Sequence, residues 1–271
     1  MNMLIGAMNN PHKKLVEEIH TFGEMNFDFL ELTIEHPRAK PEYVSKNKKE
    51  ILDALSSYNL GLVAHMPWYF SIAHPYERIQ KAVNTEMVSA LQTASMLGAK
   101  KMTLHTELSL SPSIQGRKSM IKNSIATLKE LNKKARSMGV DLLLETVTPK
   151  SCTIEEFKQI FSEVDMGMTL DVGHAEVEYK KVFEGFWKEF SPRVRHVHLH
   201  DGKGVDHLPL GAGRIDLQEI VEELKKKYDD TITLEVHSED RHYLKYSRDR
   251  LEILWYGKKK FEENRDYLYP K

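Results

Sequence analysis

The chain has 271 residues, of which 41% are hydrophobic and 29% are charged, the composition of a soluble globular protein with a real core. Its 39 basic and 40 acidic residues leave a formal net charge of −1, which gives no electrostatic reason to expect a nucleic-acid or membrane partner. Cys152 is the single cysteine, so no intramolecular disulfide can form, and the lack of a signal peptide or a long apolar span leads us to expect a cytoplasmic protein.

Eight short apolar runs recur along the chain, and each has the length of a β-strand. Their interiors are almost wholly apolar, as in parallel strands that are buried on both faces. In chain order the predicted strands are Met3–Met8, Phe27–Ile34, Leu60–Met66, Lys101–His105, Val140–Thr146, Met166–Asp171, Val194–His200 and Thr231–Val236.

Amphipathic segments with helix signals lie between these runs. Asn10-Pro11 supplies a cap and a first-turn proline for a first helix. Thr153 with Glu156 forms the sequence of a capping box for a helix over 154–164. Further helices are expected over Ala82–Leu97, Met120–Met138 and Leu217–Tyr228, the last opened by Asp216 with Glu219.

The alternation of strand and helix repeats eight times, with strand starts roughly 25 to 40 residues apart, as βαβ units require. Eight such units that close on themselves predict an α/β fold, a (β/α)8 TIM barrel in one domain over residues 1–271. An open, doubly wound sheet is the alternative, but residues 6–10 lack the glycine-rich phosphate-binding motif that would favour it. The charged tail from about residue 257 is expected to form a surface helix.

Polar side chains gather at the ends of these predicted strands. In a TIM barrel the catalytic groups come from the carboxyl ends of the strands and the loops that follow, so closure of the barrel would bring these residues together. The residues at the ends of the second to eighth strands are Glu31 and Glu35; His65; His105 and Glu107; Glu145; Asp171 and His174; His196, His198, His200 and Asp201, with His207 in the next loop; and Glu235 and His237.

This set has the chemistry of a metal site. Imidazole nitrogen and carboxylate oxygen are ligands of Zn²⁺, Mn²⁺ and Fe²⁺. So many anionic groups without a nearby Lys or Arg would repel one another unless a cation were bound. Four members, which lie at equivalent positions of successive strands, predict the site: Glu145, Asp171, His198 and Glu235. The three histidines of the seventh strand share its inward face and cannot all reach one ion.

Single members of the set have simpler interpretations. A lone strand-end histidine such as His65 or His105 is more often a hydrogen-bonded core residue than a ligand. Glu31 or Glu35 alone could form a surface ion pair. Asp171 with His174 could be a helix cap followed by a loop histidine. Cys152 has no paired base in the sequence, and a loop cysteine is usually inert.

Three motifs carry a resemblance to a known superfamily. They are Asp171-Val172-Gly173-His174, His196-Val197-His198-Leu199-His200-Asp201 and His207-Leu208-Pro209-Leu210-Gly211-Ala212-Gly213. They resemble the signatures shared by endonuclease IV-type enzymes (AP endonuclease family 2) and sugar or sugar-phosphate isomerases and epimerases. This is the xylose isomerase-like TIM-barrel superfamily, and the resemblance covers nearly the whole chain. The motifs are more specific for the superfamily than for the reaction.

For the isomerase and epimerase branch, the resemblance implies one divalent ion held by Glu145, Asp171, His198 and Glu235. The ion would acidify a C–H bond beside a substrate carbonyl, and Glu145 and Glu235 would act as base and acid around an enediolate-like intermediate. Substrate contacts are expected from His174, His207, Arg214 and Glu31. Epimerases of this branch use an arginine where this chain has Gly204, which weakens a ketose 3-epimerase assignment.

For the endonuclease branch, the resemblance implies three zinc ions. His65 and His105 with Glu145 would hold one ion, and the four residues named above would hold a second. His174 and His207 would hold the third with an aspartate two residues before His207, where this chain has Val205 followed by Asp206. The loop over residues 36–41 lacks the Arg, Gln and aromatic residues expected for penetrating a DNA duplex.

We therefore expect a metal-dependent isomerase or epimerase that acts on a small carbohydrate, a sugar or sugar phosphate. It would use one to three divalent ions, Zn²⁺ or Mn²⁺, with Mg²⁺ or Co²⁺ as alternatives. A zinc-dependent abasic-site endonuclease is the alternative function. A barrel that binds a metal or a sugar without turnover is a third interpretation.

Overall fold

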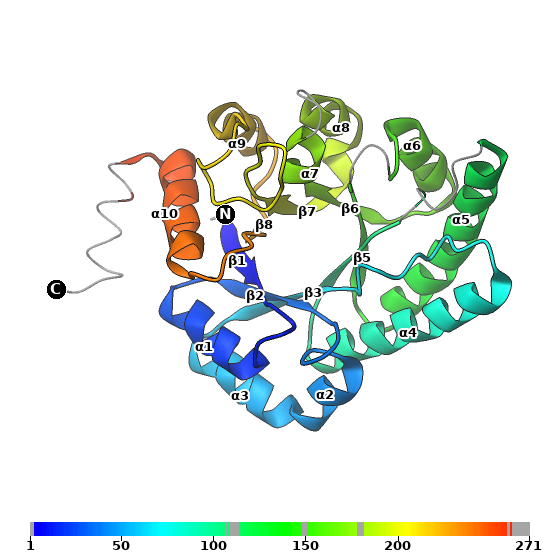
Figure 1. Cartoon of the computed structure of the whole chain (residues 1–271), viewed down its shortest axis with the longest axis horizontal. Helices are drawn as coiled ribbons and strands as arrows, with labels where there is room; N and C mark the ends of the chain where they lie inside the picture. Colours follow the sequence, from blue (N-terminus) through cyan, green and yellow to red (C-terminus); the bar gives the residue numbers. More distant parts are fainter. Residues whose placement is uncertain are drawn as a thin grey trace.

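The computed structural model of the chain is a closed barrel of eight parallel strands (Figure 1). It describes residues 3–106, 108, 114–147, 151–177, 182–258 and 261. The strands follow one another around the barrel in chain order, and the pairing of the last with the first closes it. They are β1 (Leu4–Met8), β2 (Phe29–Thr33), β3 (Gly61–His65), β4 (Lys101–Leu104), β5 (Asp141–Glu145), β6 (Gly167–Asp171), β7 (Val194–Leu199) and β8 (Thr231–Leu234). The predicted (β/α)8 barrel is confirmed, and closure excludes the open sheet.

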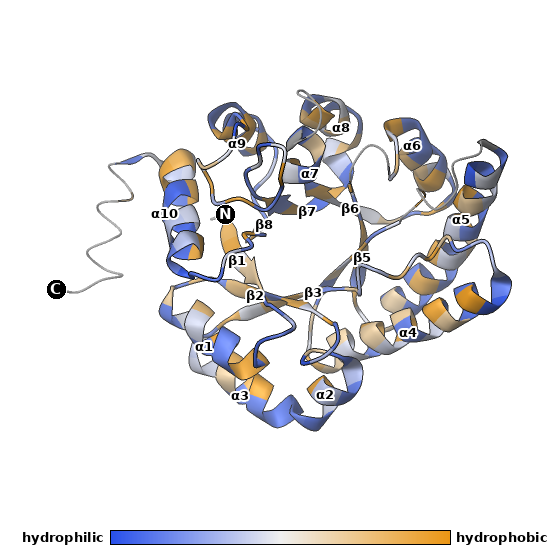
Figure 2. Ribbon diagram, in the orientation of Figure 1, coloured by the Kyte–Doolittle hydropathy of each residue, from blue (hydrophilic) through white to orange (hydrophobic). Residues whose placement is uncertain are grey.

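The helices surround this ring of strands (Figure 1). Hydrophobic and hydrophilic residues alternate along them (Figure 2), as expected for helices that pack one face on a sheet. The helices are α1 (Leu15–Glu24), α2 (Pro41–Lys46), α3 (Lys48–Ser57), α4 (Glu77–Met96), α5 (Ile114–Ser137), α6 (Ile154–Glu163), α7 (Val172–Val177), α8 (Val182–Phe190), the 3-10 turn η1 (Ser191–Arg193), α9 (Leu217–Lys225) and α10 (His242–Tyr256). No helix in the described ranges is both long and apolar enough to span a membrane.

Strand residues alternate between two buried environments. On β2, Leu30 and Leu32 belong to the large apolar core cluster between strands and helices. Phe29 and Glu31 instead contact His196 of β7, a strand that does not neighbour β2, so their side chains point into the barrel.

The interior of the barrel is polar in part, although TIM barrels usually fill it with branched apolar side chains. Thr103 of β4 and Thr169 of β6 are fully buried there, with their hydroxyl oxygens 2.8 Å apart. Glu31 and His196 are also 0% exposed. Buried polar groups of this kind need hydrogen-bond partners, and these partners organise the site described below.

The helix starts test the predicted caps. The capping box at Thr153 is confirmed, because its side chain and that of Glu156 each accept the other's backbone N–H. Asp216 caps α9 by accepting the Glu219 amide at 3.1 Å, but that helix ends at Lys225 rather than Tyr228. The start predicted at Asn10-Pro11 is wrong, because the Asn10 side chain accepts the His12 amide in a turn and α1 begins at Leu15. Beyond residue 258, all of the tail but Phe261 lies outside the described residues.

Candidate metal centre

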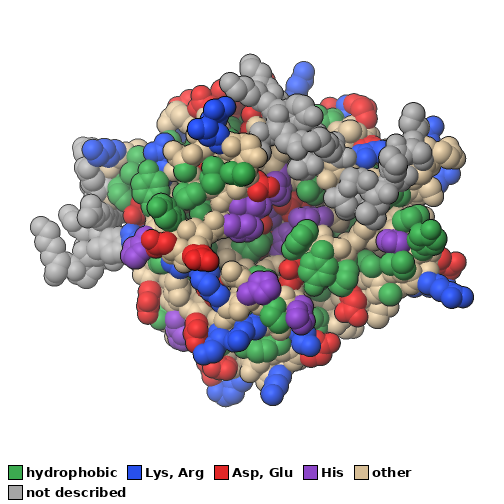
Figure 3. Space-filling view, viewed as in Figure 1, with side chains coloured by type: hydrophobic (Ala, Val, Ile, Leu, Met, Phe, Trp, Pro, Cys, Tyr) green, Lys and Arg blue, Asp and Glu red, His purple; other side chains and the backbone are tan. Residues whose placement is uncertain are grey.

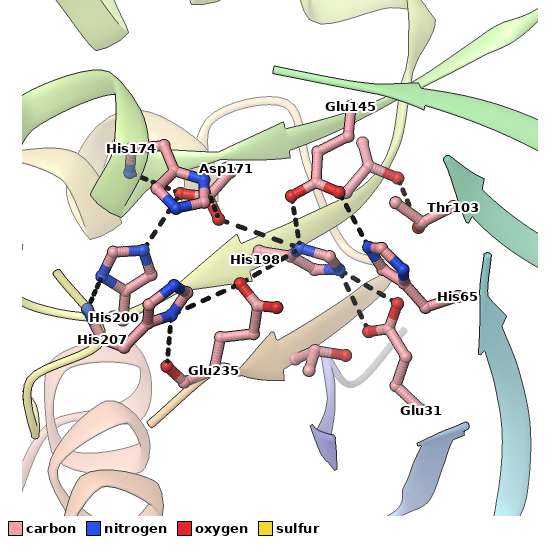
Figure 4. Close-up of polar contacts among 12 residues, drawn as sticks. Glu31, His65, Thr103, Glu145, Asp171, His174, His198, His200, His207 and Glu235 are labelled. Carbon is pink, nitrogen blue, oxygen red and sulfur yellow. Dashed lines mark hydrogen bonds and ion pairs between the residues drawn. The ribbon is translucent and has the colours of Figure 1, made fainter. Parts of the chain in front are cut away.

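The four predicted ligands meet at the carboxyl end of the barrel (Figure 4). Glu145 and Asp171 end β5 and β6, His198 pairs in register with Asp171, and Glu235 follows β8. His198 Nδ1 lies 2.9 Å from Glu145 Oε1, 3.6 Å from Glu235 Oε2 and 3.9 Å from Asp171 Oδ2. One ligand atom from each residue lies within 4.8 Å of all the others. The strand ends therefore bring this set together as the sequence predicts.

The polar atoms of this cluster are incompletely paired. Among the residues that the structure describes, nothing hydrogen-bonds to Asp171 Oδ2 or Glu235 Oε2, although both atoms are buried. A buried polar atom without a partner costs about 1–3 kcal/mol, and a charged one costs more. Three carboxylates and an imidazole nitrogen are also a donor set that divalent cations accept. The residues therefore fit a divalent cation.

The surroundings shift the pKa values of the three carboxyl groups in different directions. Burial alone would raise the pKa of Glu145, but the charges of His105 and His198 outweigh it and hold the pKa well below its usual range. For Asp171, the charges of His174 and His200 likewise overcome burial and lower the pKa. Burial raises the pKa of Glu235, and the negative charges of Glu145 and Asp171 add to this rise. Glu235 is therefore the member of the set that holds a proton most readily.

His65 and His105 both approach the second oxygen of Glu145. His65 Nε2 lies 3.0 Å and His105 Nε2 lies 2.7 Å from Glu145 Oε2. His65 Nδ1 lies 2.6 Å from the Met66 carbonyl oxygen, so this nitrogen carries a proton and Nε2 faces Glu145. Burial opposes protonation of His65, but the hydrogen bond and charge of Glu145 raise its pKa to about 9. Both histidines thus extend the cluster on one side, as hydrogen-bond partners or as ligands.

A second histidine group extends the cluster on the opposite side. It consists of His174, His200 and His207, whose ring nitrogens lie close enough to share an ion. Asp206 Oδ2 lies 3.7 Å from His174 Nε2 and 4.0 Å from His207 Nε2. Burial disfavours the charged form of His174, but the Asp171 charge outweighs it and raises the pKa to about 10. Asp206, rather than the exposed Val205, therefore stands where a carboxylate could complete this group.

The two oxygens of Asp171 have different surroundings. Its Oδ1 accepts the His174 backbone N–H at 2.6 Å at the start of α7, which is the helix-cap interpretation of the motif. Its Oδ2 stays free of that bond and faces His198. The cap holds the carboxylate still, so capping and cation binding are compatible.

The loop after β7 is held by Asp201, a role that the sequence alone did not reveal. Its carboxylate accepts backbone N–H bonds at 2.8 Å from Gly202, 2.8 Å from Gly211, 2.9 Å from Gly213 and 3.1 Å from Ile215. A side chain at Gly213 would place Cβ 2.1 Å from Asp201 Oδ1, so a residue without Cβ is required there. The glycines of the third motif were the available signal, because they allow the backbone to approach a carboxylate closely.

The same loop sets the position of His207. Its φ of 54° lies in the left-handed region, which costs a non-glycine residue about 1–3 kcal/mol. Its backbone N–H donates to His200 Nδ1 at 2.9 Å, and its Nδ1 lies 3.0 Å from the Glu235 carbonyl oxygen. These contacts hold the strained residue with its ring between His200 and His237.

Other predicted residues lie away from the centre of the cluster. Glu31 is fully buried beneath His198, which favours a positioning role over substrate contact. Arg214 is exposed, and its side chain makes no hydrogen bond or ion pair with any residue that the structure describes. Gly204 has a positive φ of 73° in the same loop. Glu107 lies outside the described residues.

An aromatic pair near the site was not predicted. Trp68 and Tyr69 follow His65 by three and four residues and are 60% and 46% exposed. The backbone N–H of Trp68 donates to the buried Glu35 carboxylate at 2.9 Å, so Glu35 does not form a surface ion pair. Histidine and acidic side chains gather in the hollowed centre of the face in Figure 3, and hydrophobic side chains lie next to them.

Comparisons with known proteins identify the family and the fold of the chain. A family model described as xylose isomerase-like TIM barrel matches residues 19–268. "Uncharacterized protein MJ1311" of Methanocaldococcus jannaschii is 28% identical over 242 residues, which cover 82% of this chain and 79% of that protein. The crystal structure of a D-tagatose 3-epimerase-like protein is 25% identical with a TM-score of 0.79, covering 95% of this chain and 99% of that one. A 3-keto-D-glucoside 4-epimerase from E. coli shares the fold at 18% identity and a TM-score of 0.76, covering 93% and 99%.

Proposed function

Because the chain belongs to the xylose isomerase-like TIM-barrel family, we propose that it is a divalent-metal-dependent isomerase or epimerase of a sugar or sugar phosphate. The observation that carries the proposal is the convergence of Glu145, Asp171, His198 and Glu235 around buried oxygens that have no hydrogen-bond partner among the described residues. The likeness to a D-tagatose 3-epimerase-like protein supports the carbohydrate substrate.

In this proposal those four residues would hold the cation. When bound, a divalent cation supplies Lewis acidity, which polarises a substrate carbonyl with its neighbouring hydroxyl and acidifies the C–H bond between them. The chain's own contribution is to place a base and an acid beside that bond. Figure 4 shows Glu145 and Glu235 on different sides of the His198 ring.

The two glutamates suit opposite proton-transfer roles. The lowered pKa of Glu145 keeps it ionised, so that it can accept the proton from carbon. Glu235 has the highest proton affinity of the three carboxyl groups, so it would be the acid that donates a proton to the opposite face of the enediolate-like intermediate. His174 and His207, which lie beside Asp171 and Glu235, would bind substrate hydroxyls.

A test in deuterated water follows from this assignment. Chelator-treated protein is reloaded with Mn²⁺, Co²⁺ or Zn²⁺ and incubated in D2O with a panel of ketoses, aldoses and their phosphates. NMR should detect deuterium at one substrate carbon, because abstraction and return of a proton exchange it with solvent. Glu145→Gln and Glu235→Gln should abolish exchange, while the exposed control Glu163→Gln should retain it. Full activity in both site variants would refute the mechanism.

A zinc-dependent abasic-site endonuclease is a second candidate, which one specific observation favours. His65 and His105 lie within 3.0 Å of Glu145 Oε2, and Asp206 lies between His174 and His207, so three adjacent ion sites could be assembled. Elemental mass spectrometry on protein purified without chelators or an affinity tag distinguishes the candidates. Two to three zinc ions per chain, with cleavage of an abasic duplex that is lost in His105→Ala, would establish the endonuclease. About one ion and no cleavage would leave the isomerase.

A further inference from the structure

We propose that Lys101, His196 and Glu31 belong to one hydrogen-bond chain, in which the Thr231 hydroxyl links Lys101 to His196. This chain crosses the barrel interior and fixes which nitrogen of His198 faces the cation. The inference rests on the proposed cation site and adds residues that act on it indirectly. None of the three would touch the substrate. They would be positioning residues that work through His198.

The end of the hydrogen-bond chain nearest the site is the Glu31 carboxylate, which lies between the imidazole of His198, shown in Figure 4, and that of His196. His198 Nε2 lies 3.1 Å from each oxygen of Glu31, and His196 Nε2 lies 2.9 Å from Glu31 Oε2. All three residues are 0% exposed, so bulk solvent does not reach these contacts. A carboxylate accepts hydrogen bonds, so an ionised Glu31 requires a proton on both Nε2 atoms.

The Lys101 end of the hydrogen-bond chain sets the donor-to-acceptor direction of its hydrogen bonds. Lys101 is the first residue of β4, at the end of the barrel opposite the site, and an ammonium can only donate hydrogen bonds. Its Nζ has three acceptors for its three N–H bonds: the Arg195 carbonyl oxygen at 2.8 Å, Asp230 Oδ2 at 2.6 Å and Thr231 Oγ1 at 3.1 Å. Lys101 therefore fixes Thr231 Oγ1 as an acceptor.

The Thr231 hydroxyl passes this direction to His196. Thr231 Oγ1 lies 2.8 Å from His196 Nδ1, both atoms being in the buried interior. Because the Glu31 carboxylate accepts a hydrogen bond from His196 Nε2–H, Nδ1 of the neutral ring is an acceptor, and the Thr231 hydroxyl, which accepts from Lys101, donates its proton to Nδ1. His196 then carries its proton on Nε2 and donates it to Glu31.

The consequence for His198 concerns its other nitrogen. With Nε2–H donated to Glu31, Nδ1 is the atom that turns toward Glu145 Oε1 at 2.9 Å. Carboxylate and imidazole nitrogen at that separation can share a proton or a cation. Partners behind a ligating histidine typically change metal affinity about 10- to 100-fold when removed. Residues at the opposite end of the barrel, which usually serve stability, here act on the site.

The experiment measures Zn²⁺ affinity by competition with a chelating dye in chelator-treated protein. Glu31→Gln keeps the size of the side chain but turns an amide N–H₂ toward one imidazole N–H, so it should weaken affinity about 10- to 100-fold. Lys101→Met keeps the aliphatic stem without donors and should weaken affinity by a smaller factor, whereas Lys101→Arg keeps the donors and should restore it. Thr103→Val is the matched control, because it removes a buried interior hydroxyl that bonds Thr169 outside the chain.

Histidine ¹⁵N NMR on metal-free protein gives a readout that does not depend on the cation. Wild type and Lys101→Arg should show the Nε2–H tautomer of His196 with a hydrogen-bonded Nδ1, and Lys101→Met or Thr231→Val should shift the Nδ1 resonance, because Nδ1 loses its fixed hydroxyl donor. Unchanged Zn²⁺ affinity in Glu31→Gln, or an Nδ1–H tautomer of His196 in the wild type, would overturn the chain and leave the proposed function standing. Wild-type protein that binds no divalent cation would refute the proposed site and this inference with it.

Discussion

Replacing the aspartate that holds the loop after β7 should cost the protein a large part of its stability. Asp201 is 1% exposed, and each of its oxygens accepts two backbone N–H bonds. In Asp201→Asn one oxygen becomes an N–H₂ group that faces two N–H donors, so two bonds are lost whichever way the amide turns. Hydrogen bonds to a charged group contribute about 1.5–3 kcal/mol each, and such losses are not additive. We expect the free energy of unfolding to fall by about 3 kcal/mol.

Urea unfolding of the two proteins measures this loss, and amide hydrogen exchange locates it. The amides of Gly211 and Gly213, or those of Gly202 and Ile215, should exchange roughly 100-fold faster, as about 3 kcal/mol implies. Asp216→Asn is the matched control, because asparagine caps a helix as well as aspartate does. A variant within about 0.5 kcal/mol of wild type, the level of an ordinary surface substitution, with all four amides still protected would refute the reasoning.

Four further predictions follow from the same contacts. In metal-free protein, facing carboxylates raise the pKa of His65 to about 9 and that of His174 to about 10, above the ordinary 6.5. Between these pH values the folded state holds protons that the unfolded state lacks. Urea titrations should therefore show the free energy of unfolding falling as the pH rises from 6.5 through 10. Zn²⁺ at 100 times its Kd should raise the free energy of unfolding by about 2.7 kcal/mol, whereas an unchanged melting temperature would contradict a bound ion. Gly173→Ala would place Cβ 2.0 Å from His200 Cε1 and should lower the free energy of unfolding in urea by about 1–3 kcal/mol, and an unchanged value would contradict the tight contact. Thr153→Ala should cost about 1 kcal/mol in the same assay through loss of the α6 cap, and no change would contradict the capping box.

The barrel and its central four residues could be predicted from sequence because both depend on periodic features. Near-continuous apolar runs mark strands buried on both faces, and the carboxyl end of each strand is fixed by where its run stops. Glu145, Asp171 and Glu235 stand at or just after those stops, so closure alone brings them together. The start of α1 was missed because Asn10 serves a local turn, which has the same sequence signal as a helix cap.

The supporting contacts could not be predicted, since they join residues far apart in the chain. Glu31 meets His196 across 165 positions, and a glutamate on an early strand has the same sequence appearance whether it faces solvent or the barrel interior. Asp201 looked like one more strand-end carboxylate, yet its partners are backbone amides, which no side-chain pattern reveals. Burial and register, which the sequence does not contain, separate these roles from cation binding.

The polar interior of the barrel also constrains how this family can diverge. A single replacement of Glu31 removes the carboxylate that faces His198 Nε2, and a single replacement of His196 removes one of the two imidazoles that face the buried Glu31 charge, so either intermediate would be counter-selected. The two positions should therefore change together during evolution, in pairs that are either both polar or both apolar. In relatives with an apolar pair, the histidine at position 198 would lack the carboxylate that fixes its protonated nitrogen. The metal preference of such relatives could then differ.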